Sequence, residues 1–266
     1  MATERSTTGS VDYLTYLGHA TVLIEVDDVR VMTDPVLRPG AMILHRMPHA
    51  ADLREYTDVD LVLISHLHHD HLDLPSLRRL RGRERGEPLI VVPLGAEAWM
   101  RGKGFTNVTE MAPGDVLNHL GVSVRCTIAV HSGKREPRGP VALAVGYVIE
   151  AGPATVYFAG DTDIFPGMAG LVPGELDVAL IPVWGWGLVL GDGHLNPATA
   201  ADAVALLNPR YAVPIHWGTF AVAGLHRLKF QRMETPPHEF AEAIAALGLD
   251  TEVLVTRPGE RVAFEP

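Results

Sequence analysis

Short runs of apolar and β-branched residues recur along the chain and predict an α/β protein. Several are continuous Val, Ile and Leu runs, a pattern typical of strands that are covered on both faces. The predicted strands are Tyr13–Leu17, Thr21–Val26, Val29–Thr33, Leu61–Ser65, Leu89–Val92, Val122–Val130, Ala142–Glu150, Thr155–Ala159, Val178–Pro182 and Tyr211–Ile215.

Helical patterns lie between these strands. They cover Leu74–Leu80, Gly95–Gly102, Pro197–Leu207 and Pro237–Leu247. In the third, Asn196 is the expected N-cap and Pro197 the first helical residue. Ala200, Val204 and Leu207 form its apolar face. Helices spread along the sequence predict layers of helix outside sheet, and the lack of a long linker predicts a single domain over residues 1–266.

Charge and composition narrow the function classes. The chain has 22 Lys and Arg against 32 Asp and Glu, a formal charge of −10, which weighs against a nucleic-acid partner or an anionic membrane surface. The first ten residues lack an apolar signal core. The longest apolar run, Val178–Leu190, is shorter than the ~20 residues of a membrane span. We therefore predict a cytoplasmic protein without a membrane anchor.

The single cysteine, Cys126, excludes an intrachain disulfide and a zinc site built from several cysteines. It lies within the predicted strand Val122–Val130, where an alternating pattern favours a buried core thiol over a catalytic one.

The chemistry is concentrated where the predicted strand Leu61–Ser65 ends. This strand runs directly into His66, His68, His69, Asp70 and His71. Crowded imidazoles repel one another when protonated, whereas a metal ion accepts their lone pairs and keeps each ring neutral. The carboxyl ends of strands are also where α/β folds place their sites. The cluster therefore predicts a metal centre.

The motif His66-x-His68-x-Asp70-His71 resembles the HxHxDH signature of the metallo-β-lactamase superfamily. Further motifs occur in the order of that family: Gly18-His19-Ala20-Thr21, Thr33-Asp34-Pro35, His131, Gly160-Asp161-Thr162 and His216-Trp217-Gly218-Thr219. Within the superfamily, the chain is most similar to the branch of ascorbate-6-phosphate lactonases and N-acyl-phosphatidylethanolamine phospholipase D. Three segments carry this similarity: Gly18-His19-Ala20-Thr21, the run Asp192–Pro197 and the run His216–Phe220. The resemblance extends over most of the chain.

This resemblance implies a four-layer αββα sandwich with two divalent metal ions in the cleft between the sheets. It assigns His66, His68 and His131 to one ion, Asp70, His71 and His216 to the other, and Asp161 as the bridge. The donors suit zinc, and they also accept manganese or iron. Two such ions can share one hydroxide, lowering its pKa from ~15.7 towards ~7. True zinc β-lactamases lack the bridging aspartate, so Asp161 weighs against antibiotic hydrolysis.

The function predicted is hydrolysis of an ester-like bond, phosphodiester or lactone, in a soluble small-molecule substrate. Asp70 and His194 are the expected catalytic residues, with His194 either donating a proton or contacting the substrate. Asp34 is expected to be the carboxylate partner of a metal-ligating histidine, fixing the tautomer and the direction of its ring. His19 is a candidate for a similar supporting role.

Four residues near the predicted metal centre are candidates for the substrate pocket. Trp184 and Trp186 form either core packing or an aromatic wall, and Lys134 and Arg135 form either a solvated loop or an anion clamp. His69 occupies a variable position of the signature and is expected to pack or face solvent. Histidines outside any motif are expected at the surface, namely His45, His49, His119, His226 and His238.

Two other functions remain open at this point. The same ligand types suit iron, so an iron-dependent redox enzyme on this scaffold is one alternative. The second is a metal-stabilised protein that binds a metabolite without converting it. The sequence does not indicate the substrate or the oligomeric state.

Overall fold

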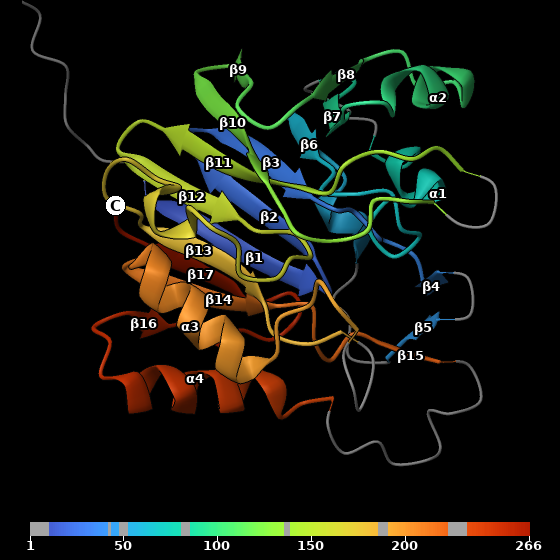
Figure 1. Ribbon diagram of the computed structural model, residues 1–266. Helices are drawn as coiled ribbons and strands as arrows, with labels where there is room; N and C mark the ends of the chain where they lie inside the picture. Colours follow the sequence, from blue (N-terminus) through green and yellow to red (C-terminus); the bar gives the residue numbers. More distant parts are fainter. Residues whose placement is uncertain are drawn as a thin grey trace, which may run out of the picture.

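The computed structural model describes residues 11–41, 44–47, 53–80, 86–135, 139–185, 191–222 and 233–266. Within these ranges the chain forms two seven-stranded sheets and a small third sheet (Figure 1). The first sheet has the order β17 (Arg261–Phe264), β1 (Asp12–Gly18), β2 (Thr21–Val26), β3 (Val29–Thr33), β6 (Leu61–Leu63), β7 (Leu89–Pro93) and β8 (Val108–Met111).

The second sheet is also mixed. Its order is β16 (Glu252–Val253), β14 (Tyr211–Ile215), β13 (Val178–Pro182), β12 (Ala154–Phe158), β11 (Val145–Ala151), β10 (Val122–Ile128) and β9 (Val116–His119). The third sheet joins β15 (Phe220–Val222), β5 (Leu44–Arg46) and β4 (Gly40–Ala41). The helices are α1 (Leu74–Leu77), α2 (Glu97–Gly102), α3 (Pro197–Leu207) and α4 (Pro236–Leu247), with 3₁₀ turns at Leu53–Tyr56 and Met168–Gly170.

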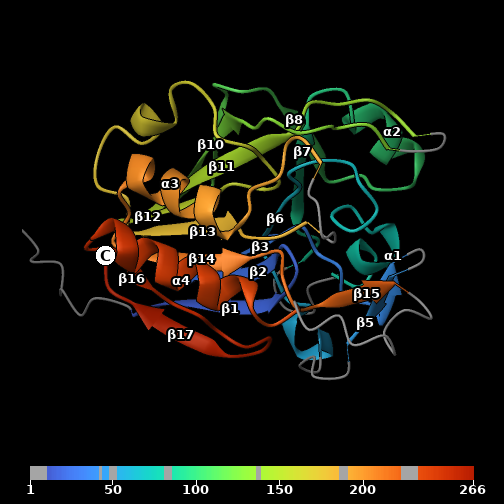
Figure 2. The same cartoon turned by 60° about the horizontal axis from the view of Figure 1, so that its bottom comes forward.

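Side-chain alternation along the first sheet explains the layers. On β2, Val22 and Ile24 join the core shared with the second sheet, whereas Leu23 joins a separate core with Leu77 of α1 and Met100 of α2. A strand period of two therefore fills both faces of this sheet. In Figure 1 and Figure 2, α3 and α4 lie together against β13 and β14, on the far side of the second sheet. The order helix, sheet, sheet, helix is the predicted sandwich.

Strand directions bring the functional loops to one edge. In the first sheet β3, β6 and β7 are parallel. In the second, β10 and β12 are both antiparallel to β11, and β12, β13 and β14 are parallel to one another. The segments that follow β10, β12 and β14 therefore leave the second sheet at the same edge.

The predicted and observed elements agree best where the apolar pattern is strong. β2, β3, β13, β14 and α3 have the predicted bounds. Asn196 caps α3 by accepting hydrogen bonds from the amides of Ala198 and Thr199. Cys126 is buried in β10, as predicted. No helix among the described residues is long and apolar enough to cross a membrane.

Several predicted elements are shorter in the structure. β6 ends at Leu63: Ile64 N–H still donates to Val91 O of β7, but Ser65 N–H turns away to the side-chain oxygen Oδ1 of Asp34. β10 ends at Ile128 instead of Val130, β11 begins at Val145 instead of Ala142, and α1 ends at Leu77 instead of Leu80. Shortening at β6 and β10 frees the backbone that carries the histidine clusters.

Candidate metal centre

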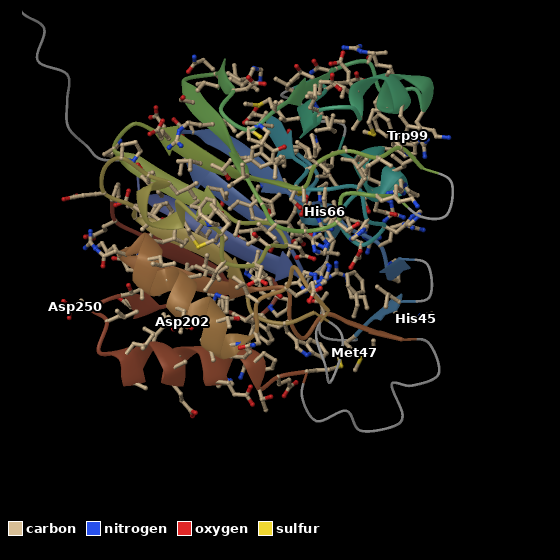
Figure 3. All side chains as sticks on the ribbon, in the orientation of Figure 1. His45, Met47, His66, Trp99, Asp202 and Asp250 are labelled. Carbon is tan, nitrogen blue, oxygen red and sulfur yellow. The ribbon has the colours of Figure 1, made fainter. Side chains whose placement is uncertain are left out.

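Three histidines from the two sheets form the first ligand group. His66 and His68 follow β6, and His131 follows β10. Nδ1 of His68 lies 2.9 Å from Nε2 of His66 and 3.2 Å from Nε2 of His131. Figure 3 shows His66 inside the molecule, where the strands end. Burial lowers the pKa of His66 well below its ordinary value and that of His131 to about 4, so both rings present lone pairs at neutral pH.

A second group lies beside the first. It consists of Asp70, His71, His216 and His19, whose ligand atoms all lie within 4.8 Å of one another. Nε2 of His71 is 3.9 Å from Oδ2 of Asp70. His71 and His216 are buried, whereas Asp70 is partly accessible. The group offers nitrogen and oxygen donors to one cation.

Asp161, which follows β12, lies between the two groups. Its Oδ2 is 3.3 Å from Nε2 of both His71 and His216, and 3.9 Å from Nε2 of His131. Burial would raise the pKa of this carboxyl, but His216 and His71 hold it well below its usual range. Asp161 is therefore a buried carboxylate that faces both groups.

The donors fit divalent cations. Burial alone would lower the pKa of His71, yet Asp161, Asp34 and Asp70 together raise it well above its ordinary value, which shows an excess of negative charge around this ring. Buried Nε2 of His71 and Oδ1 of Asp161 have no hydrogen-bond partner among the described residues. Unpaired buried polar atoms are costly, and cations bound by these two residues and their neighbours would satisfy them.

Asp34 orients one histidine of each ligand group, and it reaches His66 through Ser65. Oγ of Ser65 donates its proton to Oδ2 of Asp34 at 2.5 Å. Because that proton is used, Oγ of Ser65 is the acceptor in its hydrogen bond with Nδ1 of His66 at 3.0 Å. Asp34 also accepts from Nδ1 of His71 at 2.7 Å. Burial raises the pKa of Asp34, although His71 and Ser65 act against that rise. One carboxylate thus orients His71 directly and His66 through a hydroxyl, leaving both Nε2 atoms for a metal.

Two backbone carbonyls orient the histidines that follow the second sheet. Nδ1 of His131 lies 3.0 Å from Gly193 O, and Nδ1 of His216 lies 2.5 Å from Trp184 O. Gly193 has φ +81°, and a Cβ there would lie 2.8 Å from Val130 O and 3.1 Å from Nδ1 of His131. This close approach requires glycine.

Sequence comparison agrees with this geometry. The profile of the β-lactamase superfamily domain matches residues 29–217. The chain belongs to the metallo-β-lactamase superfamily. A UPF0173 metal-dependent hydrolase of Methanopyrus kandleri is 34% identical over 254 residues, which cover 93% of this chain and 97% of that one. The chain is a metal-dependent hydrolase of this superfamily.

Two further relatives of this hydrolase extend the comparison. N-acyl-phosphatidylethanolamine-hydrolyzing phospholipase D 1 of Caenorhabditis elegans is 31% identical over 231 residues, which cover 78% of this chain and 64% of that longer protein. The structure of Igni18, a metallo hydrolase from Ignicoccus hospitalis, superposes with a TM-score of 0.71 at 27% identity, covering 96% of this chain and 99% of that one.

His19 lies among the side chains of the second ligand group and not behind them, where a supporting residue is expected. Its Nε2 is 3.2 Å from Oδ2 of Asp70, and its ring centroid is 3.9 Å from that of His216. Burial, followed by the charge of His216, lowers the pKa of His19 to about 3. Its amide donates to Oγ1 of Thr219 at 2.6 Å, and its carbonyl accepts from the amide of His216 at 2.7 Å. These bonds join the β1–β2 turn to the segment after β14.

His194 lies beside the carboxylate that faces both groups. Its Nε2 is 3.9 Å from Oδ2 of Asp161, and its ring centroid is 4.6 Å from that of His131. Its Nδ1 lies 3.2 Å from Gly191 O. The side chain is 24% exposed, whereas that of Asp161 is 4% exposed. His194 therefore lies between the buried ligands and solvent.

The predicted pocket residues separate into different environments. Trp184 is half-buried, and Trp186 lies outside the described residues. Lys134 is exposed, but Arg135 is buried with Nη1 donating to two backbone carbonyls. Neither the solvated loop nor the anion clamp therefore describes Arg135.

The histidines without a motif are also unequal. His45 and His238 are exposed and His119 is half-buried, while His49 and His226 lie outside the described residues. His69 contacts Arg135. Sequence reasoning missed the contribution of Ser65 and of the two carbonyls, which no residue-type pattern marks.

Proposed function

We propose that this hydrolase holds two divalent ions and cleaves an ester-like bond, phosphodiester or lactone, in a soluble small molecule. The observation that supports it is the position of Asp161, whose Oδ2 faces histidines of both ligand groups at 3.3 to 3.9 Å. His66, His68 and His131 would hold one ion, and Asp70, His71 and His216 the other. Bound there, such ions would supply an acidified water and polarise a substrate oxygen.

The residues of the chain divide the remaining work. Asp34 and the carbonyls of Trp184 and Gly193 keep the ligand rings aimed inward. His194 lies at the accessible side of Asp161, where it can deliver a proton to the departing oxygen. The phospholipase relative, which by its name hydrolyses a phosphodiester-containing lipid, favours a phosphodiester as the first substrate class to assay.

The metal content is the first test. Protein purified without a histidine tag or added metal is expected to carry about two zinc or manganese ions per chain, because the structure offers two donor groups. Elemental analysis with a protein assay measures this. Predominant iron would favour the redox alternative, and a chain that neither carries nor takes up metal would overturn the proposal.

His194 can be tested separately from the ligands. Replacing His194 with Gln is expected to lower kcat about 10²-fold on a dialkyl phosphodiester, whose strongly basic alkoxide leaving group needs a proton, while the metal content stays unchanged, since a proton donor is lost and no ion ligand is removed. Steady-state kinetics with elemental analysis checks both. A loss of one ion in this variant would instead make His194 a ligand, and unchanged kcat would contradict its use as an acid.

A further inference from the structure

The buried guanidinium of Arg135 lies against the loop that carries the histidine signature. Nη1 donates to Leu67 O at 2.7 Å and to Leu72 O at 3.0 Å, which uses both of its protons. Leu67 lies between His66 and His68, and Leu72 directly follows His71. The two carbonyls therefore bracket His68, Asp70 and His71, and the first of them directly follows His66.

Arg135 also fixes the unassigned histidine of the signature. Its Nη2 lies 2.9 Å from Nδ1 of His69. A guanidinium is only a donor, so Nδ1 of His69 is the acceptor. His69, half-buried between the ligands His68 and Asp70, is thus held by a third hydrogen bond from the same side chain.

The origin of Arg135 makes these bonds a connection between the two sheets. It lies four residues after His131, on the segment that leaves β10 of the second sheet, whereas the loop it contacts follows β6 of the first. Its own backbone is held by bonds from Arg135 N–H to Pro140 O and from Gly139 N–H to Arg135 O. His66 and His68 come from one side of this connection and His131 from the other.

The aromatic ring of Trp99 covers the guanidinium. Cζ of Arg135 lies 5.3 Å from the ring centroid of this α2 residue, and Arg135 is 7% exposed. Figure 3 shows Trp99 on the α2 side of the molecule, outside His66. Burial lowers the pKa of Arg135, although Asp73 and Asp70 act against it. A buried guanidinium retained at this position keeps a fixed planar set of donors under the loop.

We infer that Arg135 is a positioning residue that sets the distance between the His66–His71 loop and His131, and through it the affinity of the metal centre. The inference rests on the proposed function, because it concerns the ions placed there. Lysine carries the same charge but concentrates its donors on one nitrogen, so it cannot serve the two carbonyls and His69 in this planar arrangement.

The test is the substitution Arg135→Lys, with Arg125→Lys as the matched control. Arg125 on β10 also donates from Nη1 to a carbonyl, Leu171 O at 2.9 Å, but six residues before His131. Zinc affinity of the metal-stripped proteins is measured by competition with a chromophoric chelator. R135K is expected to bind zinc about ten-fold more weakly, which is the size of effect seen when other residues that support metal ligands are substituted. R125K is expected to bind zinc as tightly as the unsubstituted chain.

The controls separate this inference from loss of fold and from the proposed function. Urea unfolding of the metal-free proteins shows whether R135K and R125K are comparably stable. If R135K does not fold, Trp99→Leu keeps the guanidinium and exposes it to water, and an affinity about two- to five-fold weaker is expected. Unchanged zinc affinity in R135K, or in W99L where R135K is unfolded, would overturn the inference. An unsubstituted chain that binds no zinc would overturn the proposed function instead.

Discussion

Replacing Asp161 with Asn is expected to reduce hydrolysis on the order of 10³-fold, because several kcal/mol of charge stabilisation depend on the ions that this carboxylate faces. The buried carboxylate has a pKa held well below its usual range, so it is charged under assay conditions. Asparagine has nearly the same shape but no charge. Steady-state assays on bis(4-nitrophenyl) phosphate and on a simple lactone, together with elemental analysis, measure the effect.

The control for this substitution is Asp163→Asn. Asp163 lies two residues further along, and its Oδ1 accepts from the amide of Ile164 and not from a ligand histidine. Both variants remove one negative charge from the same segment. If D161N keeps two ions per chain and full activity, Asp161 does not bridge the centre. A comparable loss in D163N would attribute the effect to the segment as a whole.

Replacing Asp34 with Asn is expected to weaken zinc binding about 10- to 100-fold, because the residue orients ligands of both groups. Asp34 is fully buried and accepts from the amide and the hydroxyl of Ser65 and from His71. The asparagine amide nitrogen is a donor, so it would face another donor wherever it is placed among these three partners. We also expect the free energy of unfolding of the metal-free variant to be about 1–3 kcal/mol lower than that of the unsubstituted chain.

Chelator competition and urea unfolding distinguish these two effects, and Asp60→Asn is the matched control. Asp60 is a buried carboxylate that accepts from the amide of Arg30 at 2.8 Å, outside the metal centre. D60N is expected to lose stability while retaining its zinc affinity. Equal zinc affinity in D34N and the unsubstituted chain would show that the Asp34 network supports the fold alone.

The core and the clustering of histidine and aspartate side chains could be predicted from the sequence because both depend on local patterns. Continuous apolar runs marked β13 and β14, and short apolar segments marked β2 and β3, since these strands are buried on both faces. The edge strands escaped prediction for the opposite reason. β9 alternates between exposed and half-buried positions, and β17 is exposed at two of its four residues. Such strands are specified by pairing with a neighbour and not by their own hydrophobicity.

The supporting contacts of the site were beyond sequence reasoning because they join distant segments. Arg135 lies 68 residues from Leu67, whose carbonyl it binds. The sequence around Arg135 is compatible with a solvated loop and with an anion clamp, and it does not mark a buried donor. The burial of this side chain depends on its packing against Trp99 and the signature loop. The bond from His131 to Gly193 O spans 62 residues and uses an atom that every residue type possesses.

This use of main-chain acceptors has an evolutionary consequence. His216 is oriented by the carbonyl of Trp184 and His131 by that of Gly193, and both carbonyls lie on the segments flanking residues 186–190. A carbonyl persists when the side chain at its position is exchanged. Side chains near Trp184 can therefore diversify towards new substrates while the orientation of the ligand rings is inherited unchanged. The glycine at position 193 marks the limit of that freedom, because a Cβ there would lie 3.1 Å from the imidazole it orients.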